Sequence, residues 1–236
     1  MGLYNKSFCK LNINLDELTK INEDMVTNGL IYRYRDMILK KYWYCTEYTI
    51  DEDVFNKLCT IDNDYFIKLY DLFTIISDDE YDEKYAKYRQ GKKFFSLDGY
   101  TAKYYQPDFI NPLLEKSAYL INSIEGLKEL VDILSNSKIM MDDTKIKNTI
   151  IQKNGIVIID PDYYKLSNKD IEFIKNNNNK ELLQLLKTLF IQYSVLKKPN
   201  VLRFFTELDN IEPLQSICYI EKELRKVKRP IDLLNL

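Results

Sequence analysis

In the first half of the chain, apolar and polar residues alternate with the period of two that is typical of half-buried β-strands. Residues 30–35 (LIYRYR) and 37–43 (MILKKYW) predict two strands, with residues 35–36 as the tight turn between them. Residues 18–21 and 94–105 predict two further strands, and the later one is expected to run into a connecting segment. The pattern therefore predicts a mainly β first half.

One helix interrupts these strands. In residues 49–60, apolar side chains recur every three or four positions, Thr49 is the expected cap, and acidic residues fill the first turn, where the helix dipole favours them. Further on, residues 77–93 are charged and rich in tyrosine, first acidic and then basic. Such a run predicts an exposed insertion between two strands.

The second half predicts mainly helices. Residues 113–134 carry apolar residues at helical spacing, with a break at 122–126, so two helices are expected after a start at Asn111-Pro112. The two final helices of the chain are predicted at residues 201–208 and 213–228.

Between these helices, residues 180–197 predict a strongly amphipathic helix that Pro199 ends. The asparagine run at 176–179 predicts a loop, and Ser167 with Asp170 resembles a capping box just before it.

A hairpin pattern lies in the middle of this helical half. Residues 149–151 and 156–159 are β-branched strand candidates, and Asn154-Gly155 is a strong signal for a two-residue turn. Asp143 and Asn148 precede the first strand, and Asp160 ends the second. Pairing of the two strands is therefore expected to bring these three side chains to one point, although an ordinary polar hairpin would look the same.

Composition narrows the chemistry. The chain has no histidine, which excludes Ser-His and Cys-His nucleophiles, histidine zinc sites and a histidine general base. Phosphoryl transfer survives, because it needs only carboxylates, an amide and a lysine. The net charge of −2 gives no basic field, so no nucleic-acid partner is expected. The chain has no apolar run long enough to predict a membrane span. Its four cysteines are scattered, which favours a reducing cytoplasm.

The stretch 143–148 (DTKIKN) resembles the D-x-K-x-x-N part of the protein-kinase-like catalytic loop, and Asp160 falls where the metal-binding Asp of D-F-G would stand. The pair Asp160-Pro161-Asp162 is more similar to the small-molecule kinases of this fold, the aminoglycoside and choline kinase type. The resemblance implies Asp143 and Lys145 as catalytic residues. It implies Asn148, Asp160 and Asp162 as ligands of Mg²⁺.

The first half carries further parts of this resemblance. Lys40 resembles the V-A-I-K lysine that holds ATP phosphates, and Gly29 is the one glycine left in the phosphate-covering loop. Glu52, with Asp53 as the alternative, is the expected acidic partner of Lys40, and Tyr105 ends the segment that would contact adenine. Residues 62–71 resemble the run that joins the kinase small-lobe helix to its fourth strand.

Together these features predict an α+β, two-lobed protein-kinase-like fold, with a small β-rich lobe at 1–105 and a mostly helical lobe at 106–236. The implied function is an ATP- and Mg²⁺-dependent phosphotransferase that acts on a hydroxyl of a small molecule or a protein. The thin glycine loop and the missing H-R and F-G residues leave open a pseudokinase-like module that binds a nucleotide or a protein without catalysis. A weaker alternative is a structural partner protein that uses the charged insertion.

Overall fold

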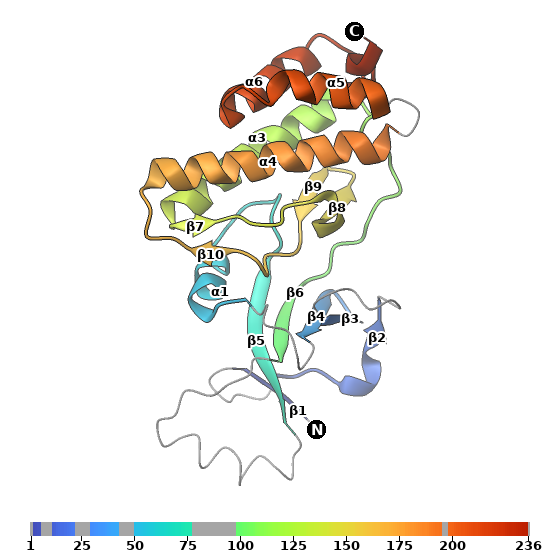
Figure 1. Ribbon diagram of the computed structural model, residues 1–236. Helices are drawn as coiled ribbons and strands as arrows, with labels where there is room; N and C mark the ends of the chain where they lie inside the picture. The colour runs from blue at the N-terminus through green and yellow to red at the C-terminus, as the bar shows by residue number, and fades with distance from the viewer. Residues whose placement is uncertain are drawn as a thin grey trace. The chain divides into compact units, whose positions relative to one another are not determined.

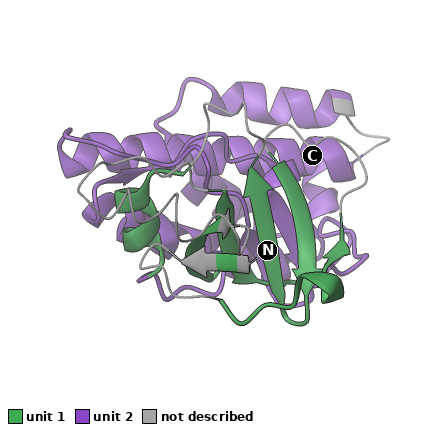
Figure 2. Cartoon of the chain, turned by 90° about the horizontal axis from the view of Figure 1, so that it is seen from below, with its two compact units in different colours: residues 1–59, 68–105 green, residues 60–67, 106–236 purple. Residues whose placement is uncertain are grey.

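A computed structural model describes residues 2–5, 11–21, 29–42, 50–76, 98–194 and 198–235 of the chain, with no side-chain description at 2, 4, 5, 75, 76, 198 and 235. The fold is α+β, and the chain divides into two compact units, each described by itself below (Figure 2). One unit comprises Met1–Cys59 with Lys68–Tyr105, and the other Thr60–Ile67 with Gln106–Leu236. The predicted insertion at 77–93 and the predicted cap Thr49 lie outside the described residues.

The first unit is built on a six-stranded antiparallel sheet. Its strands are β1 (Gly2–Asn5), β2 (Thr19–Lys20), β3 (Gly29–Tyr34), β4 (Met37–Tyr42), β5 (Leu69–Ile76) and β6 (Gly99–Lys103). Their spatial order is β1-β5-β6-β4-β3-β2. The predicted hairpin of the third and fourth strands is confirmed, and its turn falls at Arg35 and Asp36.

Strand β1 has no counterpart among the predicted elements. It is only four residues long, too short to display an alternating pattern, and its place is decided by pairing with β5. Leu3 on this strand is buried in a cluster with Tyr34, Leu39 and Phe73. The core of the first unit therefore closes around a residue that the sequence pattern does not mark.

Helix α1 spans Glu52–Leu58 and begins later than predicted. Asp51 is its N-cap, and the Asp51 carboxylate accepts hydrogen bonds from the backbone N–H groups of Asp53 and Val54 at 2.9 and 3.1 Å. The buried residues of the helix are Val54, Phe55 and Leu58, as the apolar spacing predicts.

The second unit packs helices against a small hairpin (Figure 1). Its helices are α3 (Ser117–Asn136), α4 (Ile171–Tyr193), α5 (Lys198–Leu208) and α6 (Pro213–Leu224), with short 3-10 turns η2 (Ile146–Asn148) and η3 (Pro230–Asn235). Strands β8 (Thr149–Gln152) and β9 (Gly155–Ile158) form the hairpin, and β7 (Ile139–Met140) pairs with β10 (Lys165–Leu166). Across the described ranges, no helix has both the length and the apolar character that crossing a membrane requires.

The predicted break at 122–126 is wrong, because α3 is one continuous helix. Gly126 looks like a helix breaker, yet it is there for packing: a Cβ at this position would lie 1.9 Å from the Tyr65 ring. The predicted helix start at Asn111-Pro112 is also wrong. Asn111 instead caps a turn, since its Oδ1 accepts from the Leu113 N–H at 2.9 Å.

The ring of Tyr65 is held between two glycines. A Cβ at Gly155 would lie 2.7 Å from the same ring, so Gly126 and Gly155 together leave the space that Tyr65 fills. The backbone next to this ring pairs with β9: Ile158 N donates to Tyr65 O at 2.9 Å, and Ile67 N donates to Ile158 O at 2.8 Å. Residues 60–67 thereby become part of the second unit.

The hairpin itself is confirmed, but its turn lies one residue earlier than predicted. Gln152 pairs with Gly155, so Lys153 and Asn154 are the two turn residues and Gly155 opens the second strand with a φ of 150°. That backbone conformation suits glycine, which has no Cβ to clash with its neighbours.

The predicted loop at 176–179 is wrong as well, because the asparagine run lies inside α4. The capping box prediction fails with it: Asp170 itself is the N-cap and accepts from the Phe173 N–H at 2.7 Å. Pro199 lies in the first turn of α5, where its missing N–H removes no helix hydrogen bond. Tertiary packing thus determines how far the helices extend at positions where local propensity predicts a loop or a helix end.

Replacing Gly126 by Ala tests the Tyr65 contact. The extra methyl group should lower the free energy of unfolding by about 1–3 kcal/mol through overpacking, offset by the helix propensity of alanine, which is worth about 1 kcal/mol. Urea unfolding measures the balance. The exposed neighbour Asn122→Ala is the control and should be neutral or slightly stabilising. Equal behaviour of the two variants would contradict the packing role, whereas a stabilising Gly126→Ala in a Tyr65→Ala background would support it.

Candidate functional site

The loop between β7 and the hairpin carries Asp143 in an unusual backbone conformation. Its φ is 53°, in the left-handed region that aspartate tolerates better than most residues, and its N–H donates to the Asp142 side chain at 2.9 Å. The other carboxylate oxygen of Asp142 pairs with Lys165 on β10 at 3.1 Å. The backbone is therefore bent at the residue that the sequence singles out as catalytic.

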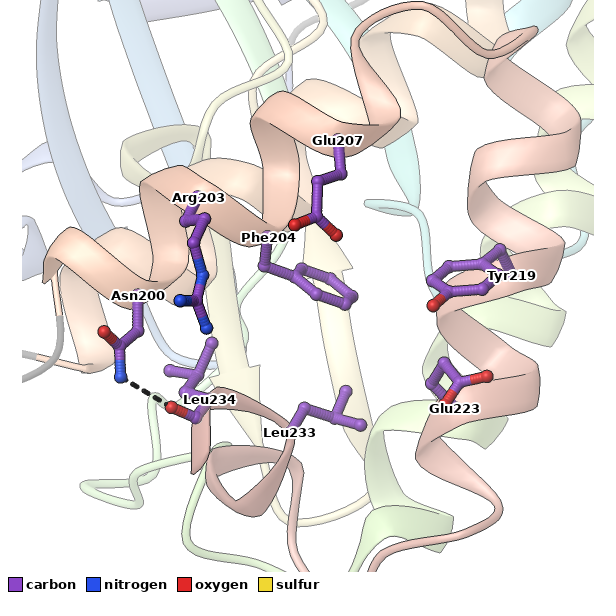
Figure 3. Close-up of a pocket in the computed structure, with 8 residues that line it drawn as sticks. All are labelled: Asn200, Arg203, Phe204, Glu207, Tyr219, Glu223, Leu233 and Leu234. Atoms are coloured by element: carbon purple, nitrogen blue, oxygen red, sulfur yellow. Dashed lines mark hydrogen bonds between the residues drawn. The ribbon is translucent and has the colours of Figure 1, made fainter. Parts of the chain in front are cut away.

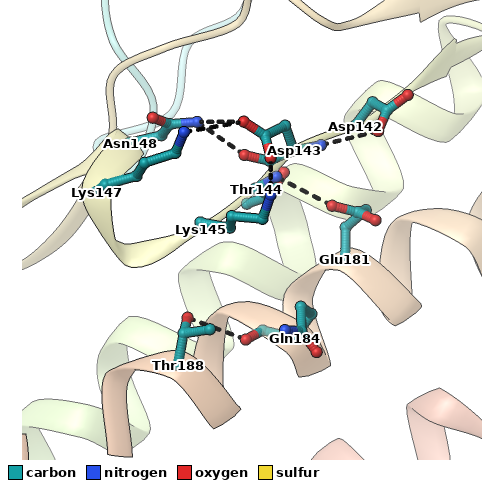
Figure 4. Close-up of polar contacts among 9 residues, drawn as sticks. All are labelled: Asp142, Asp143, Thr144, Lys145, Lys147, Asn148, Glu181, Gln184 and Thr188. Carbon is teal, nitrogen blue, oxygen red and sulfur yellow. Dashed lines mark hydrogen bonds and ion pairs between the residues drawn. The ribbon is translucent and has the colours of Figure 1, made fainter. Parts of the chain in front are cut away.

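Three side chains gather around the Asp143 carboxylate (Figure 4). Lys145 forms an ion pair with one oxygen, while Lys147 Nζ lies 3.6 Å from the other. Asn148 Nδ2 donates to the Asp143 carbonyl at 2.8 Å and approaches the carboxylate at 3.4 Å. The D-x-K-x-x-N spacing thus allows Lys145 and Asn148 to contact Asp143 within one short loop.

These contacts determine the charge state of Asp143. Burial is the largest influence and acts to raise the pKa of the carboxyl, but Lys145, Lys147 and the Asn148 amide together outweigh it. The pKa of Asp143 therefore lies below its usual range. The same ion pair raises the pKa of Lys145. Asp143 is a carboxylate that stays ionised, and its side chain is only 18% exposed.

The far end of the hairpin returns to this loop. Ile159 N donates to Asn148 O at 2.9 Å, which places the residue before Asp160 against the end of the candidate loop. Asp160 is half-buried, and Asp162 is 5% exposed. Within the described ranges, no cluster of three or more Asp, Glu, His or Cys side chains has an arrangement that could hold a metal ion.

Helix α4 holds the start of the loop. Asn178, which is 0% exposed, accepts from Met141 N at 2.7 Å and donates to Ile139 O at 3.0 Å. It also donates to Ser135 Oγ on α3 at 3.1 Å, and its neighbour Asn177 donates to Met141 O at 3.1 Å. One buried side chain therefore links α3, β7 and α4 just before Asp143.

One turn further along α4, Glu181 holds the middle of the loop. Its carboxylate accepts from Thr144 N at 3.0 Å (Figure 4). The Thr144 hydroxyl lies 3.5 Å from the buried Tyr164 hydroxyl. Burial is the main cause that raises the pKa of Glu181, and Asp142 and Asp143 act in the same direction. Glu181 and Asp143 thus have pKa values displaced in opposite directions on either side of Thr144.

The sequence-predicted nucleotide residues lie in the first unit. Lys40 is 5% exposed on β4, with its Nζ 5.9 Å from the centroid of the Tyr100 ring. Gly29 opens β3 opposite Tyr42, and a Cβ there would lie 2.2 Å from Lys41 O, so strand packing by itself accounts for this glycine. Glu52 is exposed in the first turn of α1, and Tyr105 is half-buried beside Lys103, whose Nζ lies 5.2 Å from its ring centroid.

Sequence reasoning missed Asn178 and Glu181, whose side chains hold the candidate loop. A run of asparagines favours a loop when only local propensity is considered. Helical spacing was the available signal: positions 174, 178, 182, 185 and 189 of α4 are all buried, so Asn178 lies on the core face of the helix.

A separate pocket of about 200 Å³ lies between α5, α6 and η3 (Figure 3). The rings of Phe204 and Tyr219 line it with their centroids 6.3 Å apart, and Asn200 Nδ2 donates to Leu234 O at 2.7 Å. All of its lining residues lie between positions 200 and 234, whereas the predicted site residues lie between 29 and 162. This pocket is therefore not built from the predicted site residues.

Known proteins give no guide to the site: no protein-family model matches the chain, and no curated protein matches it. This loop is the candidate site because Lys145 and Asn148 both contact Asp143, and because the hairpin that follows leads to Asp160.

Replacing Asn178 by Ala tests how the loop is held. The change leaves Met141 N and Ile139 O buried without a side-chain partner, which should cost about 2–4 kcal/mol of unfolding free energy. Urea unfolding and hydrogen exchange at the Met141 amide measure the loss. Asn176→Ala, an exposed member of the same run, should change stability by at most about 0.5 kcal/mol. Equal effects at 176 and 178 would contradict the anchoring role.

Replacing Lys145 by Gln tests the electrostatics of Asp143. Burial would then be opposed by fewer positive charges, so the pKa of Asp143 should rise, as an NMR titration of its carboxyl carbon can measure. Because the folded-state pKa is depressed, ionised Asp143 stabilises the fold above its unfolded pKa, and this contribution is lost as pH falls through the folded value. In Lys145→Gln the folded pKa lies closer to the unfolded one, so this contribution should be smaller and its loss should be complete at a higher pH. Lys165→Gln, which removes the partner of Asp142, is the control, and an unaltered Asp143 titration in Lys145→Gln would refute the account.

Proposed function

We propose that this chain is an ATP- and Mg²⁺-dependent phosphotransferase of kinase-like fold, which transfers the γ-phosphoryl group to a hydroxyl acceptor. In this proposal the β-sheet unit is the small lobe and the helical unit is the large lobe. The observation that carries it is the closed set of contacts among Asp143, Lys145 and Asn148, at the end of a hairpin whose second strand leads to Asp160.

Residues of the loop and of the β-sheet unit have distinct roles in the proposed reaction. Asp143 orients the acceptor hydroxyl and accepts its proton, and Lys145 neutralises charge on the transferred phosphoryl group. Lys40 anchors the nucleotide phosphates, with Glu52 as its acidic partner. Gly29 and Tyr105 flank the nucleotide in the small lobe.

The donor types present suit Mg²⁺, which prefers oxygen ligands. The Asn148 amide donates through Nδ2 to Asp143, and its Oδ1 is directed away from that residue (Figure 4), which leaves an oxygen for a metal ion. Asp160 and Asp162 supply carboxylates from the other end of the hairpin. When bound, Mg²⁺ would neutralise charge on the ATP phosphates.

A second candidate function has one specific observation in its favour. A general base works best when its pKa lies near the operating pH, and the pKa of Asp143 is instead lowered by two lysines. That charge state suits orientation of a hydroxyl better than proton abstraction. A pseudokinase-like module that binds nucleotide without turnover is therefore the alternative.

Thermal unfolding with ATP and MgCl₂ tests the nucleotide site. A ligand at a hundred times its Kd stabilises the folded state by about 2.7 kcal/mol, so the wild type should show a clear rise in Tm. The rise should be absent in Asp160→Ala and Lys40→Met and retained in Asp132→Ala, which removes an exposed carboxylate on α3. An equal rise in Asp160→Ala would exclude the proposed metal role.

Radiolabelled ATP then separates the two candidates. Transfer of the label to a hydroxyl acceptor, lost in Asp143→Asn, is the expected result for the phosphotransferase. A Tm rise without transfer to any acceptor in a broad metabolite panel would favour the binding module instead.

A further inference from the structure

A groove of about 520 Å³ lies in the second unit beside the Asp143 loop. One wall comes from the hairpin region 146–151, the other from the connecting segment 107–111, and the end of α4 closes it. Its volume falls within the range of about 300–1,000 Å³ that is usual for small-molecule sites.

The frame of this groove is fixed by hydrogen bonds. Asp108 N donates to Ile151 O at 2.9 Å, and Lys153 N donates to the Asp108 carboxylate at 2.5 Å, which fastens the connecting segment to the hairpin. Asn111 Nδ2 donates to Tyr193 O at 3.2 Å, which fastens the same segment to α4. The groove is therefore pre-formed, and ligand binding would not carry the entropic cost of ordering it.

Both walls of the groove carry apolar side chains that are exposed or only partly buried. Phe109 has an exposed fraction of 102%, so its ring has lost no contact with solvent, and Ile110, Ile146 and Ile150 are only partly buried. A ring stacked on Phe109 would bury apolar area on both partners and gain the additional attraction of an aromatic pair. These side chains suit a flat, aromatic ligand.

A positive charge lies between these apolar side chains and the Asp143 carboxylate. Lys147 lines the groove with a side chain that is 61% exposed, and its Nζ lies 3.6 Å from Asp143 Oδ2. Asp143 is a single carboxylate shared by Lys145 and Lys147, so the three side chains together keep one positive charge. The other charge in the groove, Asp108, already accepts the Lys153 N–H. Lys147 can therefore pair with an anionic group at the edge of the groove beside Asp143.

We propose that this groove binds the phosphoryl acceptor, and that the acceptor is an aromatic hydroxy acid. Its ring lies on Phe109, its carboxylate pairs with Lys147, and its hydroxyl faces Asp143. Because Lys147 Nζ and Asp143 Oδ2 are only 3.6 Å apart, the hydroxyl and the carboxylate belong on the same carbon, as in a 2-hydroxy acid. This inference rests on the proposed phosphotransferase function.

The reaction balances with ATP as the only co-substrate. The hydroxyl oxygen forms a bond to the γ-phosphorus, the bond from that phosphorus to the bridging oxygen of ADP breaks, and ADP leaves. The hydroxyl proton passes to the Asp143 carboxylate and from there to water.

Calorimetric titration with three probes tests the groove. The probes are 3-phenyllactate, which has ring, carboxylate and hydroxyl; lactate, which lacks the ring; and 2-phenylethanol, which lacks the carboxylate. The wild-type chain should bind 3-phenyllactate on the order of tenfold more tightly than either of the others, as expected for one aromatic contact or one charged hydrogen bond.

Variants locate the binding and provide matched controls. Phe109→Ala and Lys147→Gln should each weaken 3-phenyllactate binding on the order of tenfold. Phe173→Ala, which truncates an exposed phenylalanine on α4, and Lys153→Gln, which neutralises an exposed lysine at the hairpin turn, should bind as the wild type does. If transfer from ATP is measured, Phe109→Ala should raise KM for 3-phenyllactate with little change in kcat.

The outcomes separate this inference from the proposed function. A wild type that ATP and Mg²⁺ stabilise, but whose affinity for 3-phenyllactate is undetectable or unchanged in Phe109→Ala and Lys147→Gln, would overturn the acceptor groove alone. Binding that depends on Phe109 and Lys147, in a chain that ATP does not stabilise, would overturn the phosphotransferase and with it the acceptor role.

Discussion

The candidate site depends on one buried amide. Asn178 lies inside a long helix with no exposed surface, and its three hydrogen bonds connect α4 to α3 and to both sides of Met140. A buried amide in this position must find partners, because leaving its polar atoms or the loop backbone without them would cost several kcal/mol. The helix and the loop therefore constrain each other. Asn177 and Glu181 extend the same contact, so one face of α4 determines where the loop with Asp143 lies.

Electrostatics then determines the charge states of the two carboxylates at the loop, Asp143 and Glu181. Burial alone would favour a neutral Asp143, but two lysines and an amide keep it ionised, while Glu181 across Thr144 is shifted in the opposite direction mainly by burial. Glu181 uses its carboxylate to hold a backbone N–H, and Asp143 directs its own toward two cations. The carboxylates of Asp143 and Glu181, which lie on either side of Thr144, thus have different roles because their surroundings differ. Lys147, which contacts Asp143 and lines the groove, connects the loop to the neighbouring groove.

The β8–β9 hairpin brings Asn148 and Ile159 together, and the position of the hairpin itself depends on Tyr65. Two glycines from different elements, Gly126 and Gly155, make room for one ring, and the backbone on either side of Phe66 pairs with β9. Ring packing and backbone pairing act together, so residues 60–67 join the helical unit, although helix α1 before them and strand β5 after them belong to the sheet unit. The hairpin is consequently supported along its length, and the contact between Asn148 and Ile159 at its end is held in place.

Local pattern alone determined several parts of this protein. The β3–β4 hairpin, the β8–β9 hairpin and the buried stripe of α1 follow from alternation, β-branching and helical spacing, because those periodicities express which face of an element is buried. The D-x-K-x-x-N spacing was also sufficient to bring Asp143, Lys145 and Asn148 into contact, since all three lie within one short loop. Tertiary structure decided what depends on distant partners. Gly126 and the asparagine run looked like breaks in a helix, and only the Tyr65 ring and the backbone around Met140 explain why the helices continue through them, because packing and buried hydrogen bonds outweigh the roughly 1 kcal/mol by which such residues disfavour a helix.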